Sequence, residues 1–126
     1  MVIHGIRIAG TGVRFSPGPL MKPVKYKKGS LKQLQRYMDF KIKQWGFEDE
    51  TLSQRLLLLT EELGELAHAC RKLNGIKVDR KRELINEAGD EVADLFNLLF
   101  AVAIGLGLDI EKEVLKKHKK VDKRAY

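Results

Sequence analysis

Apolar residues recur at helical spacing through most of the chain after residue 30. Because apolar residues three and four apart lie on one face of a helix, the pattern predicts helices over residues 31–45, 51–73 and 80–106, and a fourth that begins near residue 110. The apolar positions of the second helix, which form a predicted core stripe, are Leu56, Leu59, Leu63, Leu66, Cys70 and Leu73. The alternation typical of a strand is found nowhere in the sequence. We therefore predict an all-α fold, a bundle of four helices that is completed by dimerisation.

Residues that start and stop helices mark the boundaries of these segments. A Ser or Thr followed three residues later by Gln is the capping-box form, and it occurs at Ser30 and at Thr51. Further capping and stop signals are Gly46, Asn74, Gly75, Asp79, Gly107 and Asp109. Residues 1–29 show no such pattern and contain all three prolines, so we expect a flexible leader followed by one helical domain over residues 30–126.

The charged residues, one third of the chain, are unevenly distributed around a net charge of +7. Residues 22–43 and 112–124 are basic, whereas residues 76–110 contain seven acidic and four basic residues. An acidic centre between basic ends is typical of a metal site with phosphate-binding arms, although such lysines can also serve only to solvate a surface. The basic runs lack interleaved aromatic residues, so nucleic acid is not an expected partner.

The single cysteine excludes an internal disulfide and agrees with a reducing cytoplasm. Cys70 lies on the apolar stripe, where we expect a small core residue. The apolar run over residues 95–108 is shorter than the roughly 18 residues needed to cross a bilayer, and the N-terminus lacks the apolar region of a signal peptide. We expect a cytoplasmic protein with no membrane partner, in which this run forms a buried helix.

Three pairs of acidic residues lie inside predicted helices whose other residues are mostly apolar. The pairs are Glu62 with Glu65, Glu87 with Asp90, and Glu91 with Asp94. Residues three apart share one helix face, and burying an unpaired carboxylate costs on the order of several kcal/mol. Two facing helices that each present such a pair offer four hard oxygen ligands, which suit Mg²⁺ or Mn²⁺. Exposed helices also carry such pairs through charge patterning, so the alternative to a metal site is a solvated face.

Other motifs near these acids carry less weight. Glu65 and His68 match the Glu-x-x-His unit of di-iron bundles, but such a site needs two units and the chain has one. No Ser or Cys lies in a nucleophile elbow, and there is no Gly-rich phosphate loop. Gly64 and Gly89 interrupt the predicted helices, where a missing Cβ either lets a facing helix or a hydrated metal approach or is simply tolerated.

Three segments occur in a characteristic order along the chain. They are Glu-Glu-Leu-Gly-Glu-Leu at residues 61–66, Glu-Val-Ala-Asp-Leu-Phe-Asn-Leu-Leu at residues 91–99 and Leu-Gly-Leu-Asp-Ile at residues 106–110. Together with Trp45 at the end of the first helix, they resemble the MazG-like all-α nucleoside triphosphate pyrophosphohydrolases over residues 31–124. The resemblance implies an Mg²⁺-dependent enzyme that hydrolyses (deoxy)nucleoside triphosphates to the monophosphate and pyrophosphate, a nucleotide-pool housecleaning activity.

The resemblance also implies roles for individual residues. The implied Mg²⁺ ligands are Glu62, Glu65, Glu91 and Asp94, with Glu87 and Asp90 as a competing second pair. Glu61 would hold or deprotonate the attacking water beside the catalytic Glu62 and Glu65. The candidates for substrate binding are Trp45 for the base and, for the phosphates, Arg71, Lys72, Lys117 and Lys120. Many relatives carry an aromatic residue and an asparagine where this chain has Leu98 and Val121, a departure that bears on base and sugar recognition.

Two alternatives to this function stay open. Phosphoribosyl-ATP pyrophosphohydrolases share the carboxylate pattern, but their spacer is typically shorter than the 25 residues (66–90) between Glu65 and Glu91. A non-catalytic helical dimer could instead bind nucleotide or protein through its basic ends and keep the acidic pairs as salt-bridge partners. The expected partners are therefore a nucleoside triphosphate and further copies of the chain, as a homodimer or homotetramer.

Overall fold

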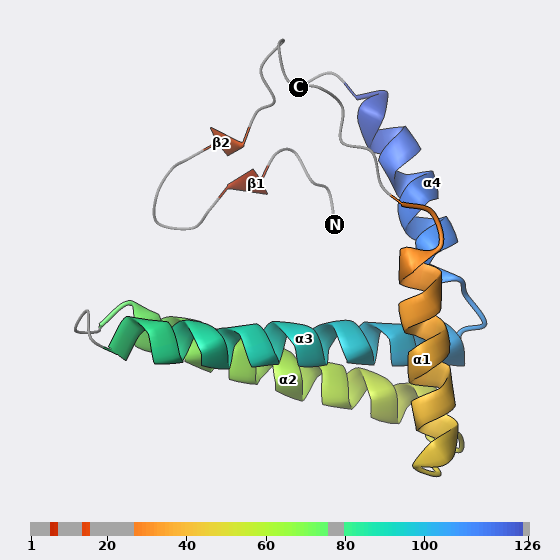
Figure 1. The fold of residues 1–126 in the computed structure, drawn as a ribbon, viewed down its shortest axis with the longest axis horizontal. Coiled ribbons are helices and arrows are strands. Elements are labelled where there is room, and N and C mark those ends of the chain that lie inside the picture. Colours follow the sequence, from red (N-terminus) through yellow and green to blue (C-terminus); the bar gives the residue numbers. More distant parts are fainter. Residues whose placement is uncertain (1–5, 8–13, 16–26, 76–79, 125–126) are drawn as a thin grey trace.

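The computed structural model describes residues 6–7, 14–15, 27–75 and 80–124 (Figure 1). Most of these residues lie in helices α1 (Ser30–Gln44), α2 (Leu52–Leu73), α3 (Lys81–Gly105) and α4 (Ile110–Asp122). The predicted all-α fold with four helices is confirmed; α1, α2 and α3 begin and end within one residue of the predicted limits, and α4 begins where it was expected.

Two short strands pair in the N-terminal stretch, where the sequence indicated no regular structure. β1 (Ile6–Arg7) runs antiparallel to β2 (Arg14–Phe15), with Ile6 opposite Phe15. Two residues are too few to show an alternating pattern, so no strand signal is visible in the sequence here. Most of the predicted flexible leader lies outside the described residues.

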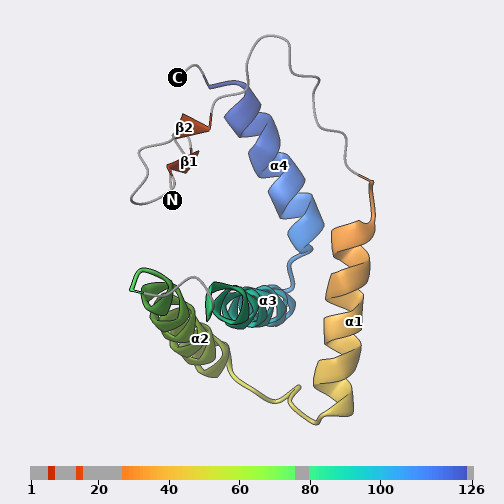
Figure 2. The same cartoon turned by 60° about the vertical axis from the view of Figure 1, so that its left-hand side comes forward.

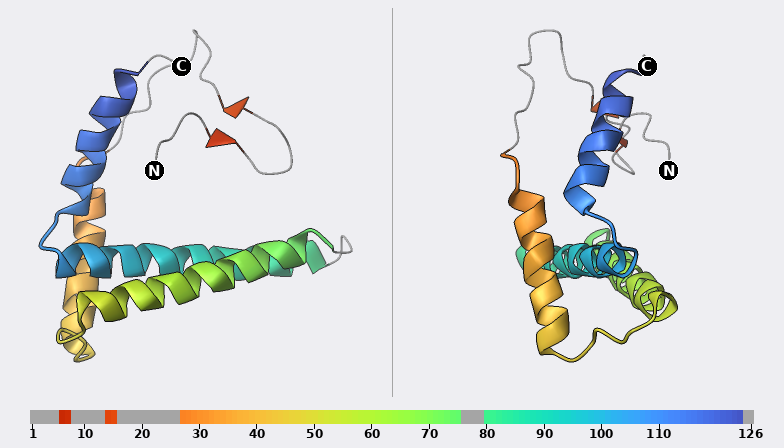
Figure 3. Two further views of the ribbon diagram at one scale, coloured as in Figure 1. Left: turned by 180° about the vertical axis from the view of Figure 1, so that it is seen from behind. Right: turned by 90° about the vertical axis from the view of Figure 1, so that its right-hand side faces the viewer.

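The helices form an L rather than a closed bundle. α2 and α3 lie side by side as an antiparallel hairpin, which is the largest contact between elements (Figures 1 and 3). α1 crosses the C-terminal end of α3, and α4 leaves that end in the direction away from the hairpin (Figure 2). Each long helix of the hairpin thus has one covered face, and the opposite face has no neighbour among the described elements.

Local side-chain caps begin two of the four helices, α2 and α4. Thr51 Oγ1 accepts from Gln54 N at 3.1 Å, and Thr51 N donates to Gln54 Oε1 at 2.8 Å, which confirms that capping box. Asp109 Oδ1 accepts from Lys112 N at 3.2 Å, so the predicted start of α4 is confirmed too.

The capping box predicted at Ser30 is wrong. The residue before α1 is Gly29, whose φ of 92° favours glycine, and its N–H donates to Glu111 Oε1 at 2.9 Å. A long-range bond from α4 therefore takes the place of a local side-chain cap. Asp79, the predicted cap of α3, lies outside the described residues.

The packed core lies where α1 crosses the hairpin. Met38 and Ile42 of α1 are buried there, as are Phe100, Ala101 and Ala103 of α3. Arg55 of α2 is buried at the same place, with Nη1 donating to the Ala101 carbonyl at 2.6 Å and Nη2 contacting the Phe47 carbonyl at 3.5 Å. This guanidinium ties the α1–α2 connection to the end of α3.

Only part of the core stripe predicted on α2 is covered, since Leu59, Leu66 and Leu73 are half-buried. Leu56 and Leu63 are 44% and 56% exposed, and Cys70 is exposed rather than a core residue. These side chains lie on the face of α2 that α3 does not cover. The spacing correctly predicted a helix, but it could not show which neighbour, if any, covers its apolar face.

The apolar run over residues 95–108 is buried on one face only. Phe100 is buried, whereas Phe96 and Leu99 are 52% and 41% exposed, which corrects the expectation of a wholly buried helix. Among the described helices none is, taken singly, long and apolar enough to cross a membrane. The pair α3 and α4 meets the length and composition requirements together, with a bend of 100° at the break.

Candidate functional site

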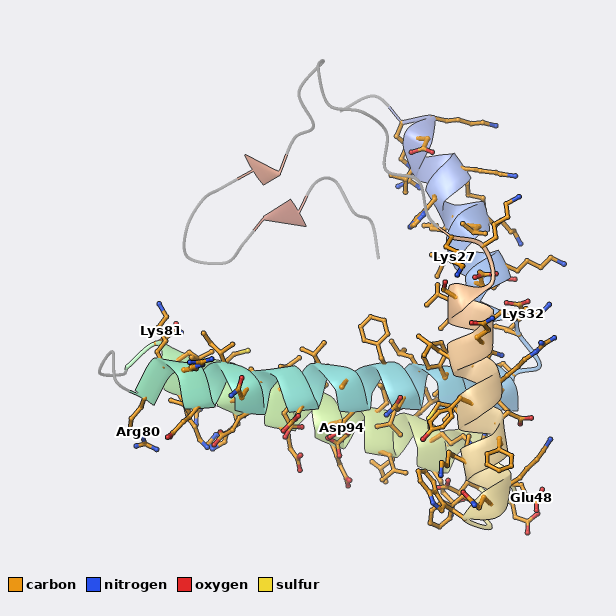
Figure 4. All side chains as sticks on the ribbon, viewed as in Figure 1. Lys27, Lys32, Glu48, Arg80, Lys81 and Asp94 are labelled. Carbon is orange, nitrogen blue, oxygen red and sulfur yellow. The ribbon has the colours of Figure 1, made fainter. Side chains whose placement is uncertain are left out.

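Three carboxylates from two helices meet midway along the α2–α3 hairpin. Glu62 and Glu65 lie three apart on α2, and the antiparallel packing brings Glu91 of α3 opposite them. One oxygen of each lies within 4.8 Å of the others. We call these three residues the carboxylate cluster. Asp94 lies one turn further along α3, midway along the hairpin (Figure 4).

The cluster contains buried oxygen atoms without partners. Oε2 of Glu62 and Oε2 of Glu91 are inaccessible and accept no hydrogen bond among the described residues. Burial chiefly, together with the nearby Glu91 carboxyl and the charges of Glu65, Asp94 and Glu91, raises the pKa of Glu62 to about 7. The site therefore favours either a proton or a cation between these carboxylates.

The donor set fits a hard divalent cation. Only carboxylate oxygens converge in the cluster, and buried oxygens without partners are what a bound ion would satisfy. None of the four ion pairs among the described residues involves Glu62, Glu65, Glu91 or Asp94. These carboxylates are thus not salt-bridge partners of any residue that the structure describes.

The competing second pair occupies a different position. Glu87 Oε2 lies 3.4 Å from Lys72 Nζ, and neither Glu87 nor Asp90 belongs to the carboxylate cluster. Both line a groove of about 670 Å³ that also contains Glu61, Glu65, Glu91 and Lys72. The structure thus places Glu91 in the cluster and Glu87 and Asp90 at the groove beside it.

Gly64 and Gly89 do not mark a close approach of helices. A Cβ built on either would meet nothing within 4 Å, so that part of the expectation is wrong. His68 is exposed and lines the groove.

A second pocket, of about 390 Å³, lies between α1 and the hairpin. It shares Glu62 and Asp94 with the carboxylate site, and its wall includes Trp45 and Phe47. We call it the aromatic pocket. Trp45 thus lies beside the acids. Because the residue is 55% exposed, its side chain covers the pocket only partly.

Sequence reasoning missed two polar residues of the aromatic pocket, Glu50 and Asn97. Asn97 could have been found, because it is the single polar side chain in the apolar run after Asp94. Glu50 carries no such signal, since it lies in the acidic, irregular connection between α1 and α2.

The four cations proposed for phosphate binding separate into two groups. Lys72 lines the groove, and Arg71 is exposed next to it on α2. Lys117 and Lys120 are exposed on α4 and line neither the groove nor the aromatic pocket, because α4 points away from the hairpin (Figure 1). Of these four, Lys72 is therefore the one that lines the groove beside the carboxylate cluster. No protein-family model matches the chain, and no match is found among curated proteins.

Proposed function

We propose that the protein is an Mg²⁺-dependent pyrophosphohydrolase that converts (deoxy)nucleoside triphosphates to monophosphates and pyrophosphate. The observation that carries this proposal is the carboxylate cluster, whose buried oxygens lack partners, placed between a polar groove and the aromatic pocket. Glu65 and Glu91 line the groove, and Glu62 lines the pocket. A nucleotide needs this combination, since its base is flat and largely apolar and its phosphates are anionic.

Glu62, Glu65, Glu91 and Asp94 would hold Mg²⁺ or Mn²⁺. The bound cation supplies Lewis acidity, which offsets phosphate charge and acidifies a water molecule. Without it the carboxylates repel a triphosphate, because the site then presents like charges to the substrate. Substrate and cation are therefore expected to bind together.

Glu61 is the proposed proton acceptor. It is exposed at the groove, one residue before Glu62, and it forms no hydrogen bond or ion pair through its side chain among the described residues. Water attacks phosphorus, the bond between the α- and β-phosphates breaks, and Glu61 takes the proton that the water loses. Lys72 and Arg71 then offset the charge on the departing pyrophosphate.

A second copy of the chain is the proposed partner. Each helix of the hairpin exposes two apolar residues that lie seven positions apart. They are Leu56 and Leu63 on α2, and Val92 and Leu99 on α3. Seven residues are close to two helical turns, so each pair shares one face. Joining two hairpins through these faces would form a four-helix bundle from two chains, in line with the dimerisation expected from the sequence.

The direct test of the function is pyrophosphate release from purified protein. Ordinary, deoxy and oxidised nucleoside triphosphates, together with phosphoribosyl-ATP, would be assayed with Mg²⁺ and again with EDTA. We expect metal-dependent release with the monophosphate as co-product. Silence from folded protein across the whole panel would overturn the proposal and favour a nucleotide- or protein-binding scaffold.

A further inference from the structure

The aromatic pocket contains polar groups that the carboxylate site does not use. Its polar members beyond Glu62 and Asp94 are Glu50, from the α1–α2 connection, and Asn97, from α3. Asn97 lies three residues after Asp94, so the two share one face of α3. Apolar side chains make up most of the remaining wall, among them Met38, Ile42, Leu58, Leu98 and Ala101.

Glu50 and Asn97 have hydrogen-bonding capacity to spare. Neither side chain forms a hydrogen bond or an ion pair among the described residues, and Glu50 is half-buried. The position of Glu50 is fixed through its backbone, whose N–H donates to the Phe47 carbonyl at 3.2 Å. A half-buried carboxylate that faces an apolar pocket gains from a ligand that supplies N–H donors.

The bases differ in the donors they offer to a carboxylate, which only accepts. Guanine presents N1–H and the 2-amino group side by side, so both can donate to the two oxygens of one carboxylate. Adenine and cytosine present an amino group beside an acceptor nitrogen, and uracil and thymine present one N–H between two carbonyls. A carboxylate therefore favours guanine most and uracil or thymine least.

We propose that the aromatic pocket binds the base and that Glu50 makes guanine nucleotides the preferred substrates of the carboxylate site. This inference rests on the proposed function. Glu50 accepts from N1–H and the 2-amino group, and the amide of Asn97 donates to a base acceptor such as O6. Trp45 and Phe47 supply the aromatic surface against which the purine packs.

The test compares Glu50→Gln with Glu48→Gln. Glu48 is exposed on the same connection and does not line the aromatic pocket, so its variant controls for the loss of a charge near α1. For each protein kcat/KM would be measured with dGTP, dATP, dCTP and dUTP. We expect the unmodified chain to prefer dGTP over dUTP by at least about tenfold, Glu50→Gln to lose about tenfold with dGTP, and Glu48→Gln to match the unmodified chain.

Trp45 gives a second readout that needs no turnover, because it is the only tryptophan of the chain. Quenching of its fluorescence by dGMP and by dUMP reports base binding directly, and we expect weaker dGMP binding in Glu50→Gln alone. Turnover without base preference, or with a preference that Glu50→Gln leaves unchanged, would overturn the inference and leave the proposed function standing. Absence of turnover with every nucleotide would overturn the proposed function, and the quenching by dGMP would still decide the role of the pocket.

Discussion

Arg55 and Glu62 are polar residues of the same helix, seven positions apart, and both place charged atoms out of reach of water. The Arg55 guanidinium, in a residue that is 4% exposed, donates to the Ala101 carbonyl and lies near the Phe47 carbonyl. Glu62 has a buried oxygen without a partner, and its charged neighbours are acidic. The Nε atom of Arg55 is also buried without a partner, but two backbone carbonyls accept from its Nη atoms, whereas only acidic groups surround Glu62.

The contrast separates a structural polar residue from a functional one. A hydrogen bond from a charged donor contributes about 1.5–3 kcal/mol when both partners are otherwise buried. Like charges close together oppose folding instead, so a chain selected only for stability would not gather Glu62, Glu65 and Glu91. Removing charge at the two places should therefore have opposite effects on stability.

The largest expected effect is on catalysis at the carboxylate cluster. Replacing Glu65 by Gln removes an oxygen that is proposed to bind the metal, and it should lower metal-dependent kcat/KM by about 1000-fold. Because the substitution also removes a like charge, the melting temperature in EDTA should stay the same or rise. Glu83→Gln, an exposed change at the start of α3, is the matched control. A variant that melts lower in EDTA while keeping its turnover would identify Glu65 as a structural residue.

At Arg55 the main effect should be on stability. Arg55→Met removes the charged donor to the Ala101 carbonyl, which keeps only its helical partner, at an expected cost of about 1.5–3 kcal/mol in the free energy of unfolding. Urea denaturation measures this quantity, and Arg36→Met, an exposed change on α1, should alter it by less than about 0.5 kcal/mol. Equal stability of the two variants would remove the contrast between Arg55 and Glu62.

A smaller effect is expected from breaking the proposed assembly. Leu63→Glu places a charge on the exposed apolar face and should weaken self-association at least about tenfold, measured by sedimentation. The control is Leu57→Glu. Leu57 is 62% exposed, but it lies about 100° around the helix from Leu56 and so off the apolar face. Leu57→Glu should therefore leave self-association unchanged. If the unmodified chain is a monomer at high concentration, the exposed apolar face does not mediate self-association. The carboxylate cluster around Glu62 is then formed by a single chain.

The smallest effect concerns pH. The pKa of Glu62 in the folded chain, about 7, lies above its usual value of 4.5, so the folded state retains a proton that the unfolded chain releases. The resulting stabilisation is fully present below about pH 4.5 and is lost as pH rises through about 7. The melting temperature in EDTA should therefore fall between pH 5 and pH 8, and Glu62→Gln should flatten this slope.

The same titration predicts how Mg²⁺ acts. Proton and cation compete for Glu62, so added Mg²⁺ should raise the melting temperature more at pH 8 than at pH 6. A Mg²⁺ effect that does not depend on pH, or that persists unchanged in Glu62→Gln, would place the cation elsewhere.

Much of the local structure could be predicted from the sequence, because it depends on neighbours along the chain. The four helices follow from apolar spacing, and the caps at Thr51 and Asp109 follow from side chains within three residues of the groups they bind. Pairs of acids on one helix face follow in the same way from the helical period. The cap at Ser30 failed for the converse reason, since Gly29 instead bonds to Glu111, which lies 82 residues away.

Only the tertiary structure decided how these local pieces meet. Glu87 and Glu91 lie four residues apart on α3, a shift of about 6 Å along its axis, so the alignment of α3 against α2 selects which of them reaches Glu62 and Glu65. The same packing leaves the Leu63 face of α2 uncovered and brings Glu50, from a connection without periodicity, to the pocket beside Glu62. Sequence periodicity determines which residues share a helix face, but the contacts that a face makes depend on how distant helices dock.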